Sequence, residues 1–236
     1  MGGRTIAFLA GLPVTTPAQG MDRVCISGVS ALHQGSMDKI LGCSDLVLVC
    51  GMEHMTHVPL DPPGSTDLMA INPRFFQDES LKQLDFQTAM SMGLTAEKLH
   101  GQSGITREEM DEWSLFSHQR AARAVKEGYF AGEILPVEVE QEDGSVQRFD
   151  TDLSMRASTT MEKLAELKPA FKPDGQITAG NSSSLNAGAT AVLLMNENKA
   201  DSLGLKPLAR VVSMEWTGVD PGLMGVGPFP ASRMTL

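Results

Sequence analysis

The sequence predicts an α/β fold, with a mixed sheet that carries a cysteine at the start of a helix. Two stretches predict this arrangement. The first, "DRVCISGVSALHQG" at residues 22–35, breaks at Ser27-Gly28 and then resumes with helical spacing. The second, "DLVLVCG" at residues 45–51, is a short β-branched apolar run that ends at glycine. The composition is that of a globular chain, since 42% of the 236 residues are hydrophobic and 20% are charged.

The first elements follow in chain order. Residues 4–12 predict the end of a helix, before a loop that Pro13 and Pro17 mark. Residues 28–41 predict the helix after the cysteine, with Gly42 just beyond its end, and residues 45–51 predict a buried strand. Residues 61–85 combine prolines, a glycine and scattered polar residues, so they predict a long excursion from this core.

A second group of elements begins with a new helix at "MGLTAEKLHGQSG", residues 92–104. Thr106 and Glu109 then form a capping-box pattern, which predicts an amphipathic helix that ends at Gly128. One face of this helix carries Met110, Trp113, Ser117 and Ala121. The Asp143-Gly144 pair between "EILPVEVE" and "SVQRFD" predicts a hairpin.

The last third of the chain predicts shorter elements. Residues 158–168 form another amphipathic segment. "GNSSSLNAGATAVLLM" predicts a polar loop and then a small-residue helix or strand that ends at Met195. Residues 208–216 alternate like a strand, and "GVDPGLMGVGPFPAS", residues 218–232, predicts a Gly/Pro-rich loop.

Charge and cysteine content exclude several classes of function. A net charge of −10 and a pI near 4.9 disfavour nucleic acid as a partner, and an anionic ligand would need a local cation or oriented N–H groups. No stretch reaches the ~18 apolar residues that a membrane span needs. Three cysteines without a C-x-x-C motif indicate a reduced, cytoplasmic setting and no zinc site.

The three cysteines allow different interpretations. Cys43 and Cys50 lie in or beside apolar runs and are expected to be small buried hydrophobes. Cys25 precedes a helical pattern, and the free N–H groups of a first turn stabilise a thiolate. Local features leave both a buried filler and a nucleophile open for Cys25.

Two further motifs could hold a metal or a ligand. "EHMTH", residues 53–57, places two imidazoles three residues apart, but no acidic or sulfur ligand recurs at a recognised distance, so no metal site is predicted. "TAGNSSSLNAGATA", residues 178–191, lacks the glycine spacing of a mononucleotide or dinucleotide cradle. It is either an ordinary loop or a wall where small side chains let a ligand approach the backbone.

Taken in order, five segments resemble the thiolase family over essentially the whole chain. They are "GLPVTTPAQGMDRVCISGVSALHQG", "DLVLVCGMEHMTHVP", "MGLTAEKL…GITREEMDEWSLFSHQRA", "LKPAFKPDGQITAGNSSSLNAGATAVLLM" and "GVDPGLMGVGPFPAS". "EHMTHVP" in particular resembles the β-subunit of bacterial fatty-acid oxidation complexes. The resemblance implies a layered thiolase-like fold, in which the N-terminal core half carries an inserted loop domain.

The resemblance also implies an activity and a site. The activity is that of a 3-ketoacyl-CoA thiolase, an acetyl-CoA C-acyltransferase of lipid metabolism, with Cys25 as the acyl-accepting nucleophile. By the same resemblance, coenzyme A and acyl-CoA are the expected substrates, and no permanently bound cofactor is expected. The residues expected to line the coenzyme A and pantetheine channel are Met92, Arg156, Phe171, Ala179, Ser183 and Met224. Arg156 would be the local cation, and Ser183 with its small neighbours would admit the pantetheine arm. A homodimer or tetramer is expected, as is a partner subunit in an oxidation complex.

The chain departs from the family pattern in sequence and in length. Asp22 stands where Asn is usual, Met52 and Ala187 replace a Gly and an Asp, and Ser91 takes a place where some members have His. The matched segments predict an N-terminal core part over residues 1–60, a loop domain over 61–180, and a return to the core over 181–236. Because the second-half histidine and cysteine motifs are not found, the chain is expected to be an interior fragment. The alternative function is a non-catalytic acyl-CoA or lipid-binding module, or a structural partner.

Overall fold

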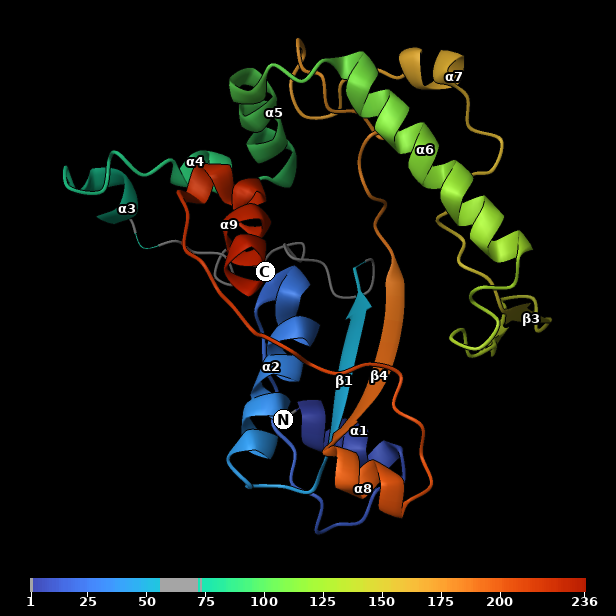
Figure 1. Ribbon diagram of the computed structural model, residues 1–236. Coiled ribbons are helices and arrows are strands. Elements are labelled where there is room, and N and C mark those ends of the chain that lie inside the picture. Colours follow the sequence, from blue (N-terminus) through green and yellow to red (C-terminus); the bar gives the residue numbers. More distant parts are fainter. Residues whose placement is uncertain (1, 56–71, 73) are drawn as a thin grey trace. The chain divides into compact units, whose positions relative to one another are not determined.

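A computed structural model describes residues 2–55, 72 and 74–236 and mixes helices with strands, as an α/β fold requires (Figure 1). The described chain forms two compact units. The first consists mainly of the residues before position 56 together with Asn186–Glu215. The second consists mainly of the described residues from 72 to 185 together with Trp216–Met234.

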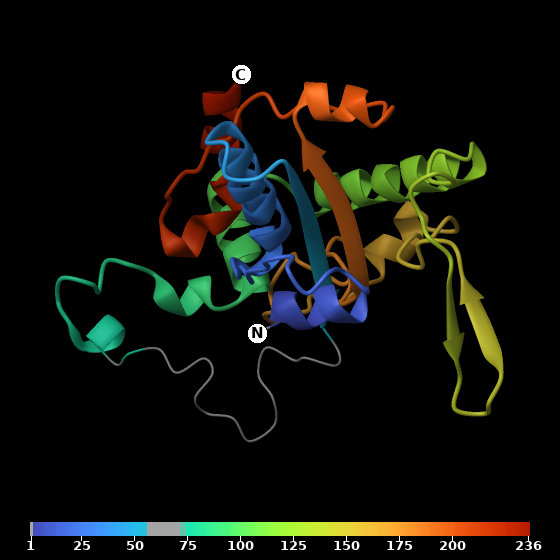
Figure 2. The same ribbon diagram turned by 90° about the horizontal axis from the view of Figure 1, so that it is seen from below.

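The first unit is built on one antiparallel strand pair. Strand β1 (Leu46–His54) pairs with β4 (Ala187–Met195). Helix α2 (Ser27–Ile40) lies along one face of the pair, and Figures 1 and 2 agree on this placement. Gly35 permits the close approach, because a Cβ there would lie only 3.0 Å from Val47 Cγ1 and 3.1 Å from Leu194 Cδ1.

The other elements of the first unit are short. Helix α1 (Gly2–Leu9) opens the chain, a 3₁₀ turn η1 (Val24–Ile26) precedes α2, and α8 (Glu197–Ser202) follows β4. The buried apolar residues of this unit are Ala7, Val49 and Ala200. Gly42 follows α2 with φ +72°, in the left-handed region that suits glycine at a helix end, so that part of the sequence prediction is confirmed.

The second unit is mostly helical. Its two long helices are α5 (Met92–Ser103) and α6 (Arg107–Lys126). The shorter elements are α3 (Arg74–Gln77), α4 (Phe86–Ala89), α7 (Met161–Ala165), the 3₁₀ segment η2 (Pro221–Val226) and α9 (Pro228–Thr235). A hairpin joins β2 (Val137–Glu140) to β3 (Val146–Phe149), with Gly144 at φ +80° in its turn, as the Asp-Gly pair predicts (Figure 2).

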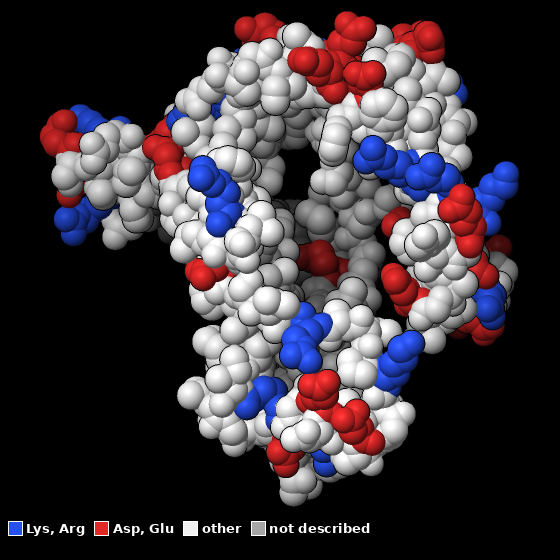
Figure 3. All heavy atoms as spheres, viewed as in Figure 1, with Lys and Arg blue, Asp and Glu red and all other residues white. Residues whose placement is uncertain are grey.

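The start of α6 is fixed by the predicted capping box. The Thr106 side chain accepts the backbone N–H of Glu109 at 3.2 Å, and the Glu109 carboxylate accepts the backbone N–H of Thr106 at 2.7 Å. The Thr106 hydroxyl also donates to the Glu109 carboxylate at 2.9 Å, and the two bonds that this carboxylate accepts, from the Thr106 backbone N–H and from the hydroxyl, lower the pKa of Glu109. Figure 3 shows acidic side chains over the first turns of α6 and basic ones along its second half, the arrangement that complements a helix dipole.

The exposed and buried faces of α6 differ from the prediction. Trp113, placed with Met110, Ser117 and Ala121 on one face, is 69% exposed. The residue of α6 that is fully buried is Asp111, at 2% exposure. Asp111 is buried although it is charged, because Arg107 and Asn181 supply its carboxylate with bonding partners.

Four other expectations about elements were wrong. Strand β1 continues through Gly51 to His54, because Gly51–His54 pair with residues 187–190 of β4. In the described residues the sheet around α2 is an antiparallel pair and not a mixed sheet. Residues 208–216 form no strand, because no described segment forms a ladder with them. Residues 218–232 are not simply a loop, because the Asp220 side chain caps η2 and Pro228 opens α9.

Candidate active site

Cys25 lies in the 3₁₀ turn that leads directly into α2, and it is exposed to solvent. The residue before it, Val24, has φ +46°, and it is the one non-glycine residue with positive φ in the described part of the chain. A β-branched residue is strained in this conformation, and such strain persists only where the surroundings fix it. The structure therefore presents the thiol at the head of a helix on a tightly constrained turn.

Three hydrogen bonds fix this turn. The backbone N–H of Val24 donates to Asp22 Oδ1 at 2.9 Å. The backbone N–H of Arg23 donates to Ser27 Oγ at 2.8 Å, and the Ser27 hydroxyl donates to the Val24 carbonyl at 2.7 Å. The departure at Asp22 is thereby explained in part, since its carboxylate oxygen makes the Asx-type bond that an Asn oxygen makes equally well.

The strand pair lies close behind the first turn of α2. A Cβ on Gly51 of β1 would lie 4.0 Å from the Gly28 Cα and 3.1 Å from Thr190 Oγ1 of β4. At Gly51 a side chain would crowd Thr190, whereas a Cβ on Gly28 would meet no atom within 4 Å, so the requirement for a small residue lies at Gly51. Gly51-Met52 stands where the family pattern has a Gly-Gly pair. The glycine that is kept, Gly51, is the one that lies near the start of α2.

The expectation that Cys43 and Cys50 are buried was wrong, because both are exposed. Cys43 falls in the turn after α2. Cys50 alternates with Val49, which is buried on the α2 side of β1, so its side chain points to the opposite face of the strand. Solvent accessibility therefore does not distinguish Cys25 from the other two thiols, and its position on the turn does.

All six predicted coenzyme A residues lie in the second unit. Met92 is the first residue of α5, is 63% exposed, and follows Ser91, whose side chain caps the helix. The Phe171 ring packs directly on Gly93, the residue after Met92. A Cβ on Gly93 would lie 2.0 Å from Phe171 Cγ. The Phe171 ring therefore lies against the start of α5, at the residue that follows Met92.

Met224 lies on η2, which packs on α4 and α5. Lys98 Nζ of α5 lies 2.8 Å from Asp85 Oδ2 and 3.9 Å from Asp220 Oδ1, which caps η2. The hydrogen bond from Lys98 is the largest cause that lowers the pKa of Asp85 to about 2, followed by bonds from Thr88. The Lys98–Asp220 pair links η2, the segment that carries Met224, to α5.

Ala179 and Ser183 are exposed residues of the loop that precedes β4. Two buried carboxylates beneath this loop, Glu97 and Asp111, bond to it and were not identified from the sequence. No local signal could have found them, because charged residues in helical patterns are normally assigned to the solvent face.

Arg156 lies between β3 and α7 and is exposed. Its backbone N–H donates to His118 Nδ1 at 3.2 Å, which attaches this segment to α6. Among the residues that the structure describes, no carboxylate forms an ion pair with its guanidinium. The structure therefore leaves this cation accessible to an anionic ligand, and it shows no contact between Arg156 and the other five residues.

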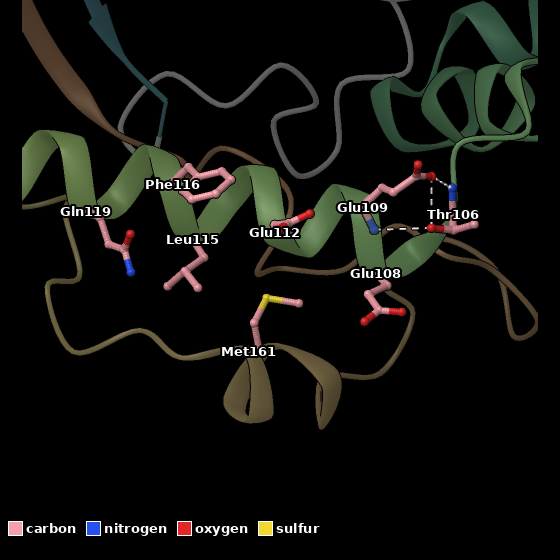
Figure 4. A pocket seen from close by; sticks show the side chains of 8 residues that line it. All are labelled: Thr106, Glu108, Glu109, Glu112, Leu115, Phe116, Gln119 and Met161. Carbon is pink, nitrogen blue, oxygen red and sulfur yellow. Dashed lines mark hydrogen bonds between the residues drawn. The ribbon is translucent and has the colours of Figure 1, made fainter.

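A pocket between α6 and α7 is a poor candidate for the same ligand. It measures about 310 Å³, and Figure 4 shows the side chains that surround it: Thr106, Glu108, Glu109, Glu112, Leu115, Phe116, Gln119 and Met161. Its three glutamates would repel a nucleotide phosphate, and it contains none of the predicted site residues. Within the described residues no cluster has the donors of a metal site, and His57 of the His54–His57 pair lies outside those residues.

The fold and the turn around Cys25 define an α/β protein that presents a thiol at the head of a helix. The thiolase N-terminal domain family matches residues 2–198. The chain belongs to the thiolase family. In the described residues no helix is long and apolar enough to cross a membrane.

Named relatives agree with this assignment. The chain is 44% identical over 235 residues to an acetyl-CoA acetyltransferase of Pseudomonas aeruginosa, covering 99% of this chain and 60% of that protein. It is 41% identical over 239 residues to a 3-ketoacyl-CoA thiolase of Pectobacterium carotovorum, covering 99% of this chain and 58% of that protein. The chain therefore spans about 60% of the length of these relatives.

A solved structure supports the fold directly. The crystal structure of human mitochondrial 3-ketoacyl-CoA thiolase matches with a TM-score of 0.83 at 35% identity, covering 99% of this chain and 60% of that one. The thiolase-like α/β fold predicted from the sequence is confirmed.

Proposed function

We propose that this chain is the cysteine-bearing part of a thiolase that cleaves 3-ketoacyl-CoA with coenzyme A, or runs the reverse condensation, with Cys25 as nucleophile. The observation that carries the proposal is the exposed Cys25 on the strained, hydrogen-bonded turn at the head of α2. Relatives named acetyl-CoA acetyltransferase and 3-ketoacyl-CoA thiolase support the reaction class.

The chemistry divides one difficult cleavage into two transfers. The Cys25 thiolate attacks the 3-keto carbonyl, a Cys25–acyl thioester bond forms, and the bond between the second and third acyl carbons breaks. The electron pair of that bond leaves with acetyl-CoA, whose α-carbon takes up a proton. A coenzyme A thiol then gives up its proton and attacks the acyl-cysteine, which regenerates the Cys25 thiolate and releases the shortened acyl-CoA.

The second unit would bind the coenzyme A part of the substrate. Arg156 would hold a phosphate of the nucleotide, since its guanidinium is accessible and can form paired bonds with phosphate oxygens. Ala179 and Ser183 would admit the pantetheine arm past small side chains, and Met92, Phe171 and Met224 would supply apolar contacts around α5. Coenzyme A acts here as a substrate, with no permanently bound cofactor.

The organisation of the whole protein belongs to the same proposal. Residues 1–60 and 181–236 would form the core part and residues 61–180 the loop domain. The whole protein would assemble as a homodimer or tetramer. It would also associate with a partner subunit in fatty-acid β-oxidation. Leu48 and Leu193, paired across β1 and β4 on the face away from α2, are each 46% exposed, and apolar surface of this kind supports oligomerisation.

The experiment is incubation with acetyl-CoA followed by intact-mass measurement and peptide mapping. One acetyl group should appear on the peptide that contains Cys25, and none in the Cys25→Ser variant. Cys43→Ser and Cys50→Ser are matched controls that should label like the parent, since both thiols are also exposed. Acetylation spread evenly over the three cysteines, or its absence from Cys25, would contradict the proposal.

A further inference from the structure

The loop that carries Ala179 and Ser183 is fixed by side chains rather than by regular secondary structure. Between residues 176 and 181, five backbone N–H groups donate to side-chain oxygens, those of residues 176, 177, 178, 180 and 181. Within the part of the chain that the structure describes, one isolated bridge, between Pro169 and Thr178, adds a strand-like contact. The loop therefore depends on the few side chains that accept these bonds.

Glu97 of α5 provides the first anchor. Its side chain is 3% exposed, and its Oε1 accepts the backbone N–H groups of Gln176 and Ile177, both at 2.8 Å. Lys172 Nζ lies 3.9 Å from Oε2 and supplies a partial counter-charge. A buried carboxylate that accepts consecutive backbone N–H groups makes charge-assisted bonds that a neutral acceptor would not match.

Glycine next to this anchor is independent evidence of a tight fit. A Cβ on Gly175 would lie 2.2 Å from Glu97 Oε1 and 3.0 Å from Lys172 Cγ. Gly175 does not have a left-handed φ, so the requirement here is for space. The loop backbone therefore lies directly against the Glu97 carboxylate.

Asp111 of α6 provides the second anchor, through Asn181. Asp111 Oδ2 lies 2.7 Å from Arg107 Nε, and Asp111 Oδ1 accepts Asn181 Nδ2 at 3.1 Å. Asn181 Nδ2 also donates to the Gln176 carbonyl at 3.1 Å, while its Oδ1 accepts the Thr178 backbone N–H at 2.8 Å. The Asn181 side chain thus bonds across the turn to two residues that precede Ala179, Gln176 and Thr178.

We propose that Glu97 and Asp111 are positioning residues, which hold the 176–183 loop so that Ala179 and Ser183 receive the pantetheine arm of coenzyme A. This inference rests on the proposed function for its ligand. Both carboxylates are buried beneath the loop, whereas Ala179 and Ser183 are exposed on it. Glu97 and Asp111 therefore act through the loop and not by touching substrate.

The test compares three ligands by isothermal titration calorimetry: coenzyme A, pantetheine, and adenosine 3′,5′-bisphosphate. The variants are Glu97→Gln and Asp111→Asn, with Glu112→Gln as a matched control, since Glu112 is exposed on α6 next to Asp111. In both variants the Kd for coenzyme A and for pantetheine should rise about tenfold, the order of losing one charge-assisted bond. The Kd for adenosine 3′,5′-bisphosphate should not change, because Arg156 lies outside the anchored loop.

Weaker binding of coenzyme A and pantetheine with unchanged binding of adenosine 3′,5′-bisphosphate would not result if Glu97 and Asp111 only stabilised the fold. A general loss of folded protein would weaken all three ligands alike, and that result would overturn the proposal, as would unchanged binding of pantetheine. Gly175→Ala tests the same contact from the loop side, and it should weaken pantetheine selectively even if Glu97→Gln folds poorly.

Amide hydrogen exchange of the free protein tests the anchoring of the loop separately from the proposed thiolase function. Glu97→Gln should speed exchange at Gln176 and Ile177 and leave the amides of α2 unchanged. If the parent chain binds no coenzyme A, the proposed function fails and so does the ligand part of this inference. If coenzyme A binds but exchange at Gln176 and Ile177 does not change, the anchoring alone is wrong.

Discussion

Replacing Gly93 with alanine should force the Phe171 ring away from α5. The new Cβ would lie 2.0, 2.1 and 2.2 Å from Phe171 Cγ, Cδ1 and Cδ2. Carbon atoms in contact are separated by about 3.5 Å or more, so the ring would have to move by about 1.5 Å. Overpacking of this kind costs about 1–3 kcal/mol, and the better helix propensity of alanine returns up to about 1 kcal/mol. We expect a net loss of about 1–2 kcal/mol in the free energy of unfolding.

Urea denaturation measures this change, with Gly101→Ala as the control. Gly101 lies in the same helix, and a Cβ there would have no atom within 4 Å. Gly101→Ala should therefore stabilise the chain by about 0.5–1 kcal/mol. In a Phe171→Ala background, Gly93→Ala should also become stabilising, because the clash is gone. A Gly93→Ala variant that is as stable as Gly101→Ala with Phe171 present would refute the reasoning.

Two further predictions concern helix ends and pH. Thr106→Ala removes the capping box and should lower the free energy of unfolding by about 1 kcal/mol. The pKa of Glu109, followed by NMR, should rise because the carboxylate loses a bond from Thr106. Unchanged stability or an unchanged Glu109 titration would contradict this prediction. Asp85, whose pKa is lowered to about 2, adds stability that is fully present above the pKa of an unfolded Asp, about 3.9, and is lost as the pH falls through about 2. Lys98→Met should raise the pKa of Asp85 and flatten the decline of stability between these pH values, and an unshifted Asp85 titration would show that the ion pair is not the cause.

The parts of the fold that depend on nearby residues could be predicted from the sequence. The Thr106–Glu109 capping box spans four positions, and the Asp143-Gly144 turn requires only adjacent residues, so each carries its own signal. The placement of Cys25 before a helix was visible for the same reason. These features need no knowledge of what packs against them.

The parts that depend on distant partners could not be predicted. Glu97 is buried because it bonds to Gln176, 79 positions away, and Asp111 because it bonds to Asn181, 70 positions away. The exposure of Cys50 and Trp113 likewise follows from which elements pack against β1 and α6. Apolar periodicity indicates which face of a helix or strand could be buried. Whether that face is buried depends on another element that packs against it, and the sequence does not reveal where that element lies.

The most direct test of the central claim compares alkylation of the three cysteines by iodoacetamide, with peptide mapping at several times. All three thiols are exposed, so accessibility alone predicts similar rates. If Cys25 is the nucleophile at the head of α2, it should react faster than Cys43 and Cys50, and added coenzyme A should slow Cys25 alone. Equal rates at the three positions, or a Cys25 rate that coenzyme A does not change, would contradict the account.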